Sequence, residues 1–427
     1  MEKVICGPIV RRVNENSAYI WLVLQGEFDA DEISAEAFRD QNKISTEFDF
    51  EQLTLSDTLN VLMLNISSHE VWPDDQAISY DITYKSHSIF DPSLNYFDGL
   101  QPIYPGHSLP FFKYMSKHEK LLSASCRKPH GAEAPKGNND ALAAFDKRIE
   151  QKINPIKLPS LLFLTGDQIY ADDVEPSFAE FIANESKKFF PQESIPQLKG
   201  IDTLNDIRHD KRDNLLGHKD GFYSEVKSCH LIGFREFFVM YLAVWGGLKV
   251  NLNSPELGIR EEHRLRHEKP REYNVYKRKL RDHKKVLGFL EQSQRVRRLM
   301  AHISTYMMFD DHEVTDDWNL NEKISNDLSR EGGIGQRIVT NALASFSIFQ
   351  AWGNDPESLK SRIFDDVAPY VYELSSYSSN ITNTTFKALN NSFSFMVPSN
   401  PPALVVDTRT QRAFEASSIS LVNDKEM

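Results

Sequence analysis

The chain is poor in cysteine and has no long hydrophobic run. Its three cysteines, Cys6, Cys126 and Cys229, are widely spaced and odd in number. They do not form the even set of a disulfide framework, so the chain is expected to be reduced and intracellular. The apolar run near the N-terminus spans only about six residues, too short for a signal peptide, and no stretch approaches membrane-spanning length. We therefore expect a cytoplasmic protein without membrane association.

Positive charge is also in deficit. The chain has 49 Lys and Arg against 61 Asp and Glu, a formal net charge of −12. This excess of acid argues against a general nucleic-acid or membrane-surface protein. No GxxxxGK[ST] loop occurs, which excludes a P-loop nucleotide-binding protein. What remains is an ordinary globular composition, 40% apolar and 26% charged, whose 427 residues suggest two or three domains.

The first 112 residues are rich in β-strand signals. Residues 17–24, 59–67 and 77–85 are dense in β-branched and aromatic side chains. Apolar residues alternate strictly from Ile78 to Tyr84, as in a half-buried strand. We predict an N-terminal β-sandwich over residues 1–112, followed by a turn-rich segment and a second domain over residues 113–427.

The second domain has a different pattern. Four short apolar runs (residues 120–126, 161–167, 305–311 and 403–407) suit strands buried on both faces of a central sheet. Between them, residues 231–245 and 337–352 have helical patterns, whereas residues 375–385 are polar and loop-like. Interleaved strands and helices predict an α/β domain.

Each of the four apolar runs ends in a residue that can bind a metal, namely Cys126, Asp167, Asp311 and Asp407. In open α/β sheets, ligands sit at the carboxyl ends of the strands, where residues distant in sequence meet. Taken alone, Gly-Asp after a strand is usually a turn. Four such positions favour a shared site.

The third run leads into five carboxylates within eight residues, 310–317, with His312 among them. Such a cluster costs free energy by like-charge repulsion unless a cation lies within it. Two cations bridged by one aspartate can clamp a phosphoryl group and lower the pKa of a shared water. Asp167 can bridge, Asp311 can bind the second ion, and His312 can assist the leaving oxygen.

The motifs that contain these residues resemble those of a known protein family. "GDQIYAD" (166–172) followed by "DDHEV" (310–314) resembles the alkaline phosphatase D (PhoD-like) branch of the metallophosphoesterases. "SASCR" (123–127) and "DTRTQR" (407–412) are similar to further strand ends of that family, and "GPIVRRV" and "SAYIWL" to its fibronectin-III-like β-sandwich. The resemblance implies a metallophosphoesterase-like sheet core with helices, preceded by the small sandwich, and an enzyme that hydrolyses phosphate monoesters or diesters.

The resemblance also implies a role for each residue. Cys126 and Tyr170 would bind a ferric ion, Asp167 would bridge, and Asp311 would hold calcium or another divalent cation. His312 would face the phosphate. Thiolate and phenolate ligands suit ferric iron, and carboxylates suit calcium. The expected partner is a phosphate-ester substrate, with no specific nucleic acid.

Three alternatives stay open at this stage. Arg127 and Arg409 could clamp phosphate or pair with neighbouring acids. Asp316 and Asp317 could cap a helix or bind metal, replacing the downstream histidines of the superfamily, because none of the 13 histidines lies beyond His312. A chain that lacks the C-terminal part of the catalytic domain could instead be an inactive relative that binds a metal or a partner.

Overall fold

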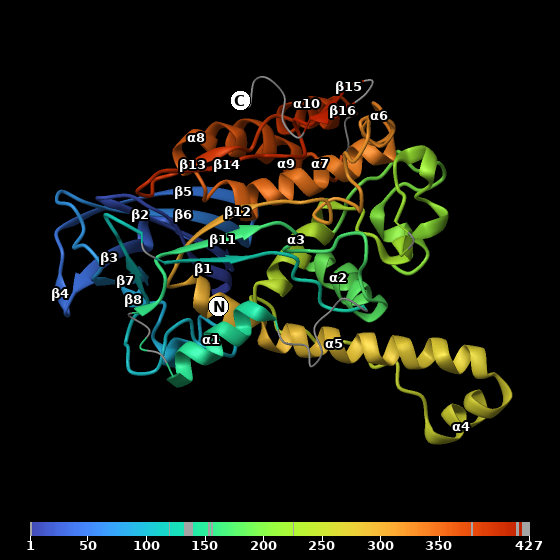
Figure 1. Cartoon of the computed structure of the whole chain (residues 1–427), viewed down its shortest axis with the longest axis horizontal. Coiled ribbons are helices and arrows are strands. Elements are labelled where there is room, and N and C mark those ends of the chain that lie inside the picture. Colours follow the sequence, from blue (N-terminus) through green and yellow to red (C-terminus); the bar gives the residue numbers. More distant parts are fainter. Residues whose placement is uncertain are drawn as a thin grey trace.

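Two antiparallel sheets face each other in the N-terminal part of the chain (Figure 1). The computed structural model describes residues 2–118, 120–131, 140–152, 154, 157–224, 226–376, 379–415 and 418–420. One sheet has the order β1 (Lys3–Val13), β2 (Ser17–Gln25), β6 (Leu59–Ser68), β5 (Thr46–Ser56). The other has the order β4 (Asn42–Lys43), β3 (Ile33–Arg39), β7 (Ala77–Tyr84), β8 (His87–Ser88), with β9 (Phe111–Lys113) also paired to β7. The predicted strands are confirmed, and the predicted domain boundary falls inside β9.

The alternation predicted for residues 78–84 is present in β7. Ile78, Tyr80, Ile82 and Tyr84 are all buried and face a core shared by both sheets. The second face of the four-stranded sheet is also covered, because β1 packs against β12 (Ser304–Met308). This contact supports the strand that leads into the acidic residues 310–317.

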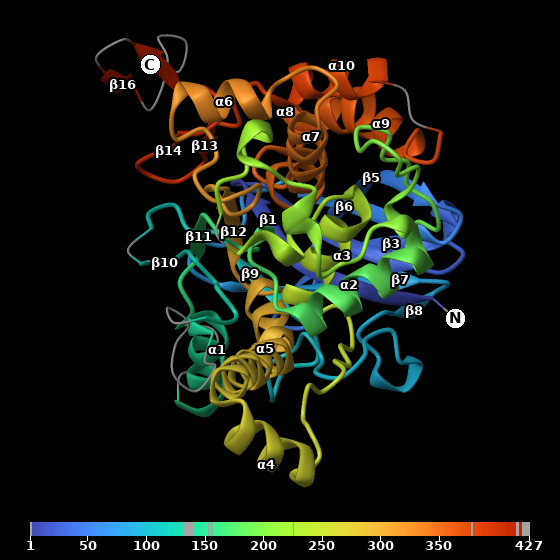
Figure 2. The same ribbon diagram turned by 90° about the vertical axis from the view of Figure 1, so that its right-hand side faces the viewer.

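Three parallel strands form the sheet that positions the candidate site. They have the order β10 (Leu121–Ala124), β11 (Leu161–Thr165), β12, and each pairs in register with its neighbour. Figures 1 and 2 show β11 and β12 between two groups of helices, with α1 and α5 on one side and α7 and α10 on the other. This parallel sheet between helices, beside antiparallel sheets, makes the chain a mixed α/β protein.

The helices are as follows: α1 (Ala141–Lys152), α2 (Pro176–Phe189), α3 (Phe234–Val244), α4 (Ile259–Glu268), α5 (Pro270–Met300), α6 (Glu322–Leu328), α7 (Ile334–Phe346), α8 (Pro356–Ser361), α9 (Ala368–Tyr372) and α10 (Ser379–Leu389). The prediction of a helix buried all round is confirmed, because every residue of α3 is buried. The second predicted helix is α7, continued by the π-helical segment η8 (Ser347–Ala351). None of the helices in the described part of the chain combines the length and apolar character needed to cross a bilayer.

Three sequence predictions are wrong. The fourth apolar run forms β14 (Ala403–Val405), which pairs antiparallel with β13 (Phe395–Val397) instead of extending the parallel sheet. Neither β10 nor β14 is buried on both faces, since Leu121 is 60% exposed and Leu404 58% exposed. Residues 379–389 form α10 instead of a loop, because tertiary packing of Phe386 and Leu389 overrides the weak helix propensity of a Ser/Thr/Asn-rich segment.

Candidate metal centre

The three parallel strands bring their carboxyl ends to one edge of the sheet. Two of the residues that follow them have left-handed backbones, Cys126 with φ of 53° and Asp167 with φ of 43°. The amides of Cys126 and Arg127 donate to the carbonyls of Gly166 and Asp167 at 3.2 and 2.9 Å, which joins the first two strand ends. Non-glycine residues in this conformation are strained and cluster at functional sites.

Gly166 lets the second and third strand ends approach closely. Its φ is 117°, and a Cβ atom placed on it would lie 2.8 Å from the Cβ of Asp310. A larger residue would push the two loops apart. The sequence "TGD" therefore serves the contact between β11 and β12 as well as the turn.

Asp167 is the centre of the cluster. Its Oδ2 accepts a hydrogen bond from the Tyr170 hydroxyl at 3.2 Å, and the Cys126 thiol also hydrogen-bonds its carboxylate. One ligand atom each from Asp167, Asp311 and His312 lies within 4.8 Å of the others. The structure thus brings together all four predicted metal ligands and His312. Their roles as ligands remain a prediction.

A second group of acids adjoins the first. Ligand atoms of Asp311, Asp316 and Asp317 also lie within 4.8 Å of one another. The Asp317 amide donates to Oδ2 of Asp311 at 3.2 Å, and Asp317 has a left-handed φ of 61°. Of the two alternatives for Asp316 and Asp317, this arrangement favours cation binding, because neither residue caps a helix: α6 is capped by Asn321.

His312 is held in one orientation from two sides. Its Nδ1 lies 2.8 Å from Oδ1 of Asp172, and its ring lies 4.4 Å from that of Tyr170. Burial alone would lower the pKa of His312, but the hydrogen bond to Asp172 raises it to about 9. In the metal-free protein this pKa favours the protonated imidazole at neutral pH, with Nδ1–H donating to Asp172.

Glu313 is a structural residue that sequence reasoning missed. Its carboxylate is buried and accepts the amides of Asp167, Gln168 and Asp310 at 3.0, 2.7 and 3.0 Å. Burial and the nearby charge of Asp167 raise the pKa of Glu313 to about 8. Glu313 thereby fixes the two loops that carry the cluster. The sequence of residues 310–317 does not distinguish an acid that points inward from its half-buried neighbours.

Both arginines pair with acids. The Arg127 guanidinium is buried against Asp140, at 2.6 Å, and the Val244 carbonyl. These contacts hold it to the start of α1 and do not favour its predicted role as a phosphate clamp. Arg409 lies 2.5 Å from Asp310 and 3.3 Å from Asp311, so it is a resident cation at the edge of the cluster.

In the turn after β14, Arg409 contacts the acidic cluster, whereas Asp407 does not. Asp407 is fully buried and accepts the amides of Phe393, Arg409 and Thr410. All of its described contacts fold the turn after β14, and the turn directs Arg409 to Asp310. The expectation that Asp407 offers a ligand is therefore not met.

The cluster has the properties of a cation site. Oδ1 of Asp167 is buried and has no hydrogen-bond partner among the described residues. Burial, with the charges of Asp310 and Asp311, raises the pKa of Asp167, and burial and the charge of Asp172 raise that of Asp316. A carboxylate oxygen without a donor, among acids that resist ionisation, fits a bound metal.

Comparison with known proteins yields little similarity in sequence. No model of a protein family matches the chain, and no curated protein matches it. A solved structure described as "Structure of PhoD" is similar over 97% of this chain, with 12% sequence identity and a TM-score of 0.40. The chain spans 53% of the length of that structure.

Proposed function

We propose that this protein is a metal-dependent phosphoesterase that hydrolyses phosphate monoesters or diesters. The observation that carries the proposal is the convergence of a thiol, a phenol, carboxylates and a protonated histidine at one sheet edge. Cys126, Asp167, Asp311 and His312 come from three different strand ends. This donor set combines cation binding with a proton donor, which is what ester hydrolysis at phosphorus requires.

Cys126, Tyr170 and Asp167 would hold a ferric ion, and Asp311 with Asp316 or Asp317 would hold calcium or another oxygen-seeking cation. Burial and the Asp167 charge raise the pKa of Tyr170, and burial raises that of Cys126. In metal-free protein both groups are therefore protonated, and a cation is needed to ionise them. Bound cations would supply charge neutralisation at the phosphate and acidify a water molecule.

His312 acts as the general acid in this proposal. Asp172 holds Nδ1, which leaves Nε2 as the nitrogen that can give a proton to the departing oxygen. Asp172 thus stabilises the imidazolium and sets its orientation. The Tyr170 ring limits rotation of the imidazole by lying against it.

The test is hydrolysis of bis(4-nitrophenyl) phosphate by purified protein supplied with ferric iron and calcium, combined with metal analysis of the same sample. We expect nitrophenol release that depends on bound metal and stops with a chelator. Metal uptake without hydrolysis of either this diester or 4-nitrophenyl phosphate would reject the enzymatic proposal.

One observation favours a second candidate, a non-catalytic protein that binds a cation or a partner. Arg409 already neutralises part of the acidic cluster, with Nε 2.6 Å from Oδ1 of Asp310 and Nη2 3.3 Å from Oδ2 of Asp311. A guanidinium in this position competes with a second cation for Asp311. Metal uptake limited to one equivalent, with no hydrolysis, is the outcome that supports this candidate.

The competition predicts opposite effects of Arg409→Gln on two measurements. Affinity for the divalent cation should rise about tenfold, because Asp311 loses an opposite charge within contact distance. The metal-free protein should be destabilised by about 1–3 kcal/mol, because Asp310 and Asp311 lose their counterion. Calorimetric titration with calcium and thermal unfolding measure the two effects.

Arg412→Gln is the matched control for this experiment. Arg412 lies in the same turn but donates to the carbonyls of Thr408 and Asn319 and forms no ion pair among the described residues. Its charge acts on Asp310 and Asp311 without an ion pair, so its replacement should change calcium affinity much less than that of Arg409. Equal affinities for the Arg409 and Arg412 variants would show that Arg409 does not compete for Asp311.

A further inference from the structure

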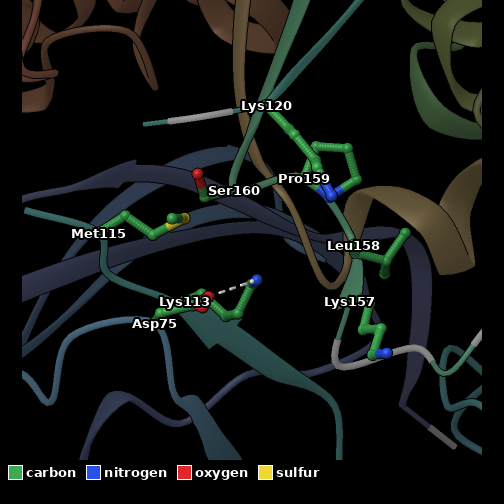
Figure 3. Close-up of a pocket in the computed structure, with 8 residues that line it drawn as sticks. All are labelled: Asp75, Lys113, Met115, Lys120, Lys157, Leu158, Pro159 and Ser160. Carbon is green, nitrogen blue, oxygen red and sulfur yellow. Dashed lines mark hydrogen bonds and ion pairs between the residues drawn. The ribbon is translucent and has the colours of Figure 1, made fainter. Parts of the chain in front are cut away.

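A hollow lies at the amino ends of the parallel strands, at the other end of the sheet from the candidate metal centre. Figure 3 shows it beside the Lys113 end of β9, where Lys120 leads into β10 and Ser160 into β11. Because these are the amino ends of the strands, the length of β11 separates the hollow from Asp167, a distance of about 15 Å. Its volume is about 440 Å³, which is within the range of small-molecule sites.

Positive charge dominates the lining of this hollow. It contains Lys113, Lys120 and Lys157 but a single acid, Asp75, so the lining carries a formal charge of +2. Lys113 is only 8% exposed, and its ammonium lies 3.1 Å from Asp75. The side chains of Lys120 and Lys157 are exposed and have no ion pair or hydrogen bond among the described residues.

The remaining lining combines a hydroxyl with apolar surface. Ser160 is 3% exposed, and its Oγ lies 2.7 Å from Nδ1 of His118, which fixes the position of the hydroxyl. Met115 and Leu158 supply the apolar part of the wall. Ammonium groups beside a fixed hydroxyl suit a dianion, and the apolar wall suits a carbon moiety attached to it.

We propose that this hollow binds a small molecule that carries a phosphate group. A phosphate monoester has a charge close to −2 at neutral pH, which matches the formal +2 of the lining. Lys120 and Lys157 bind the phosphate oxygens as point charges and together supply the formal +2, because Lys113 is already paired with Asp75. This site is separate from the metal cluster and does not depend on the proposed hydrolysis.

The experiment uses the full chain with Asp167→Asn in the presence of a chelator, so that the metal cluster cannot contribute. Isothermal titration calorimetry with phenyl phosphate and with inorganic phosphate should each give one binding event. Tighter binding of phenyl phosphate identifies an organic phosphate as the ligand class, and equal binding identifies the free ion. Either result supports a phosphate site.

Lys120→Ala and Lys157→Ala, introduced singly into this protein, should each weaken binding about tenfold or more, as expected for loss of a charge-assisted contact. Both lysines are exposed, so the variants should fold. Lys199→Ala, at an exposed lysine between α2 and α3, is the matched control and should leave affinity unchanged. Unchanged affinity in the Lys120/Lys157 double variant, or no binding of either probe at millimolar concentration, overturns the proposal. Hydrolysis by the wild-type protein has no bearing on this outcome.

Discussion

Asp167→Asn is expected to abolish metal-dependent hydrolysis and most metal binding while leaving the metal-free fold at least as stable. The carboxylate of Asp167 lies among Cys126, Tyr170, Asp311 and His312, so it stands between the residues proposed for the first cation and Asp311, proposed for the second. Loss of a bridging charge removes several kcal/mol of transition-state stabilisation, which is a rate loss of about a thousandfold or more.

The stability part of this prediction separates a lost ligand from a damaged fold. Burial and neighbouring acids raise the pKa of Asp167, so a neutral amide of the same shape removes an electrostatic cost in metal-free protein. The melting temperature with a chelator should therefore stay equal or increase. Added metal should raise the melting temperature of the wild type but not that of the variant.

Asp57→Asn is the matched control for Asp167→Asn. Asp57 is exposed in the turn between β5 and β6, where asparagine is equally suitable. This variant should keep wild-type activity and metal content. If Asp167→Asn retained full metal content, or if both variants lost activity equally, the metal centre would not be where we place it.

The sequence predicted the convergence of the cluster because one physical rule was sufficient. Parallel strands place their carboxyl ends at one edge, so residues at three strand ends had to meet there. Cys126, Asp167 and Asp311 satisfied this rule, since β10, β11 and β12 are adjacent and parallel. Asp407 did not, because β14 pairs antiparallel with β13 and lies outside that sheet.

The direction of individual side chains could not be predicted in the same way. In the acid-rich segment, Glu313 turns inward to three amides, whereas its neighbour Asp311 joins the cluster. Two of the three donors that hold Glu313 inward, the amides of Asp167 and Gln168, lie 146 and 145 positions away in the sequence. Arg127 likewise pairs with Asp140 because of where α1 packs.

The metal-free protein is expected to lose stability as pH rises from about 6.5 to 9. Glu313 has its pKa raised from 4.5 to about 8 in the folded state, so the stability that its protonated form contributes is still being lost between pH 6.5 and 8 and is gone above pH 8. His312 has its pKa raised to about 9, so its contribution is complete below pH 6.5 and is lost as pH rises through 9. Both groups are largely buried and act with the same sign.

Below pH 6.5 two other histidines act in the opposite direction. Burial lowers the pKa of His230 to about 4 and of His302 to about 3, so protonating them in acid favours unfolding. The window from pH 6.5 to 9 therefore isolates the cluster. Across it we expect a loss on the order of 2 kcal/mol or more in the free energy of unfolding of chelator-treated protein.

Bound cations should weaken this pH dependence, because they add positive charge beside Asp167, whose negative charge helps to raise the pKa of both Glu313 and His312. Glu313→Gln should weaken the dependence in chelator-treated protein, since glutamine cannot ionise and keeps an oxygen that accepts amides. Denaturant unfolding at pH 6.5, 8 and 9, with and without metal, measures both effects. If the slope in metal-free protein were flat, or if metal stabilised the protein equally at every pH, the acids at the sheet edge would not be an uncompensated cluster that requires a cation.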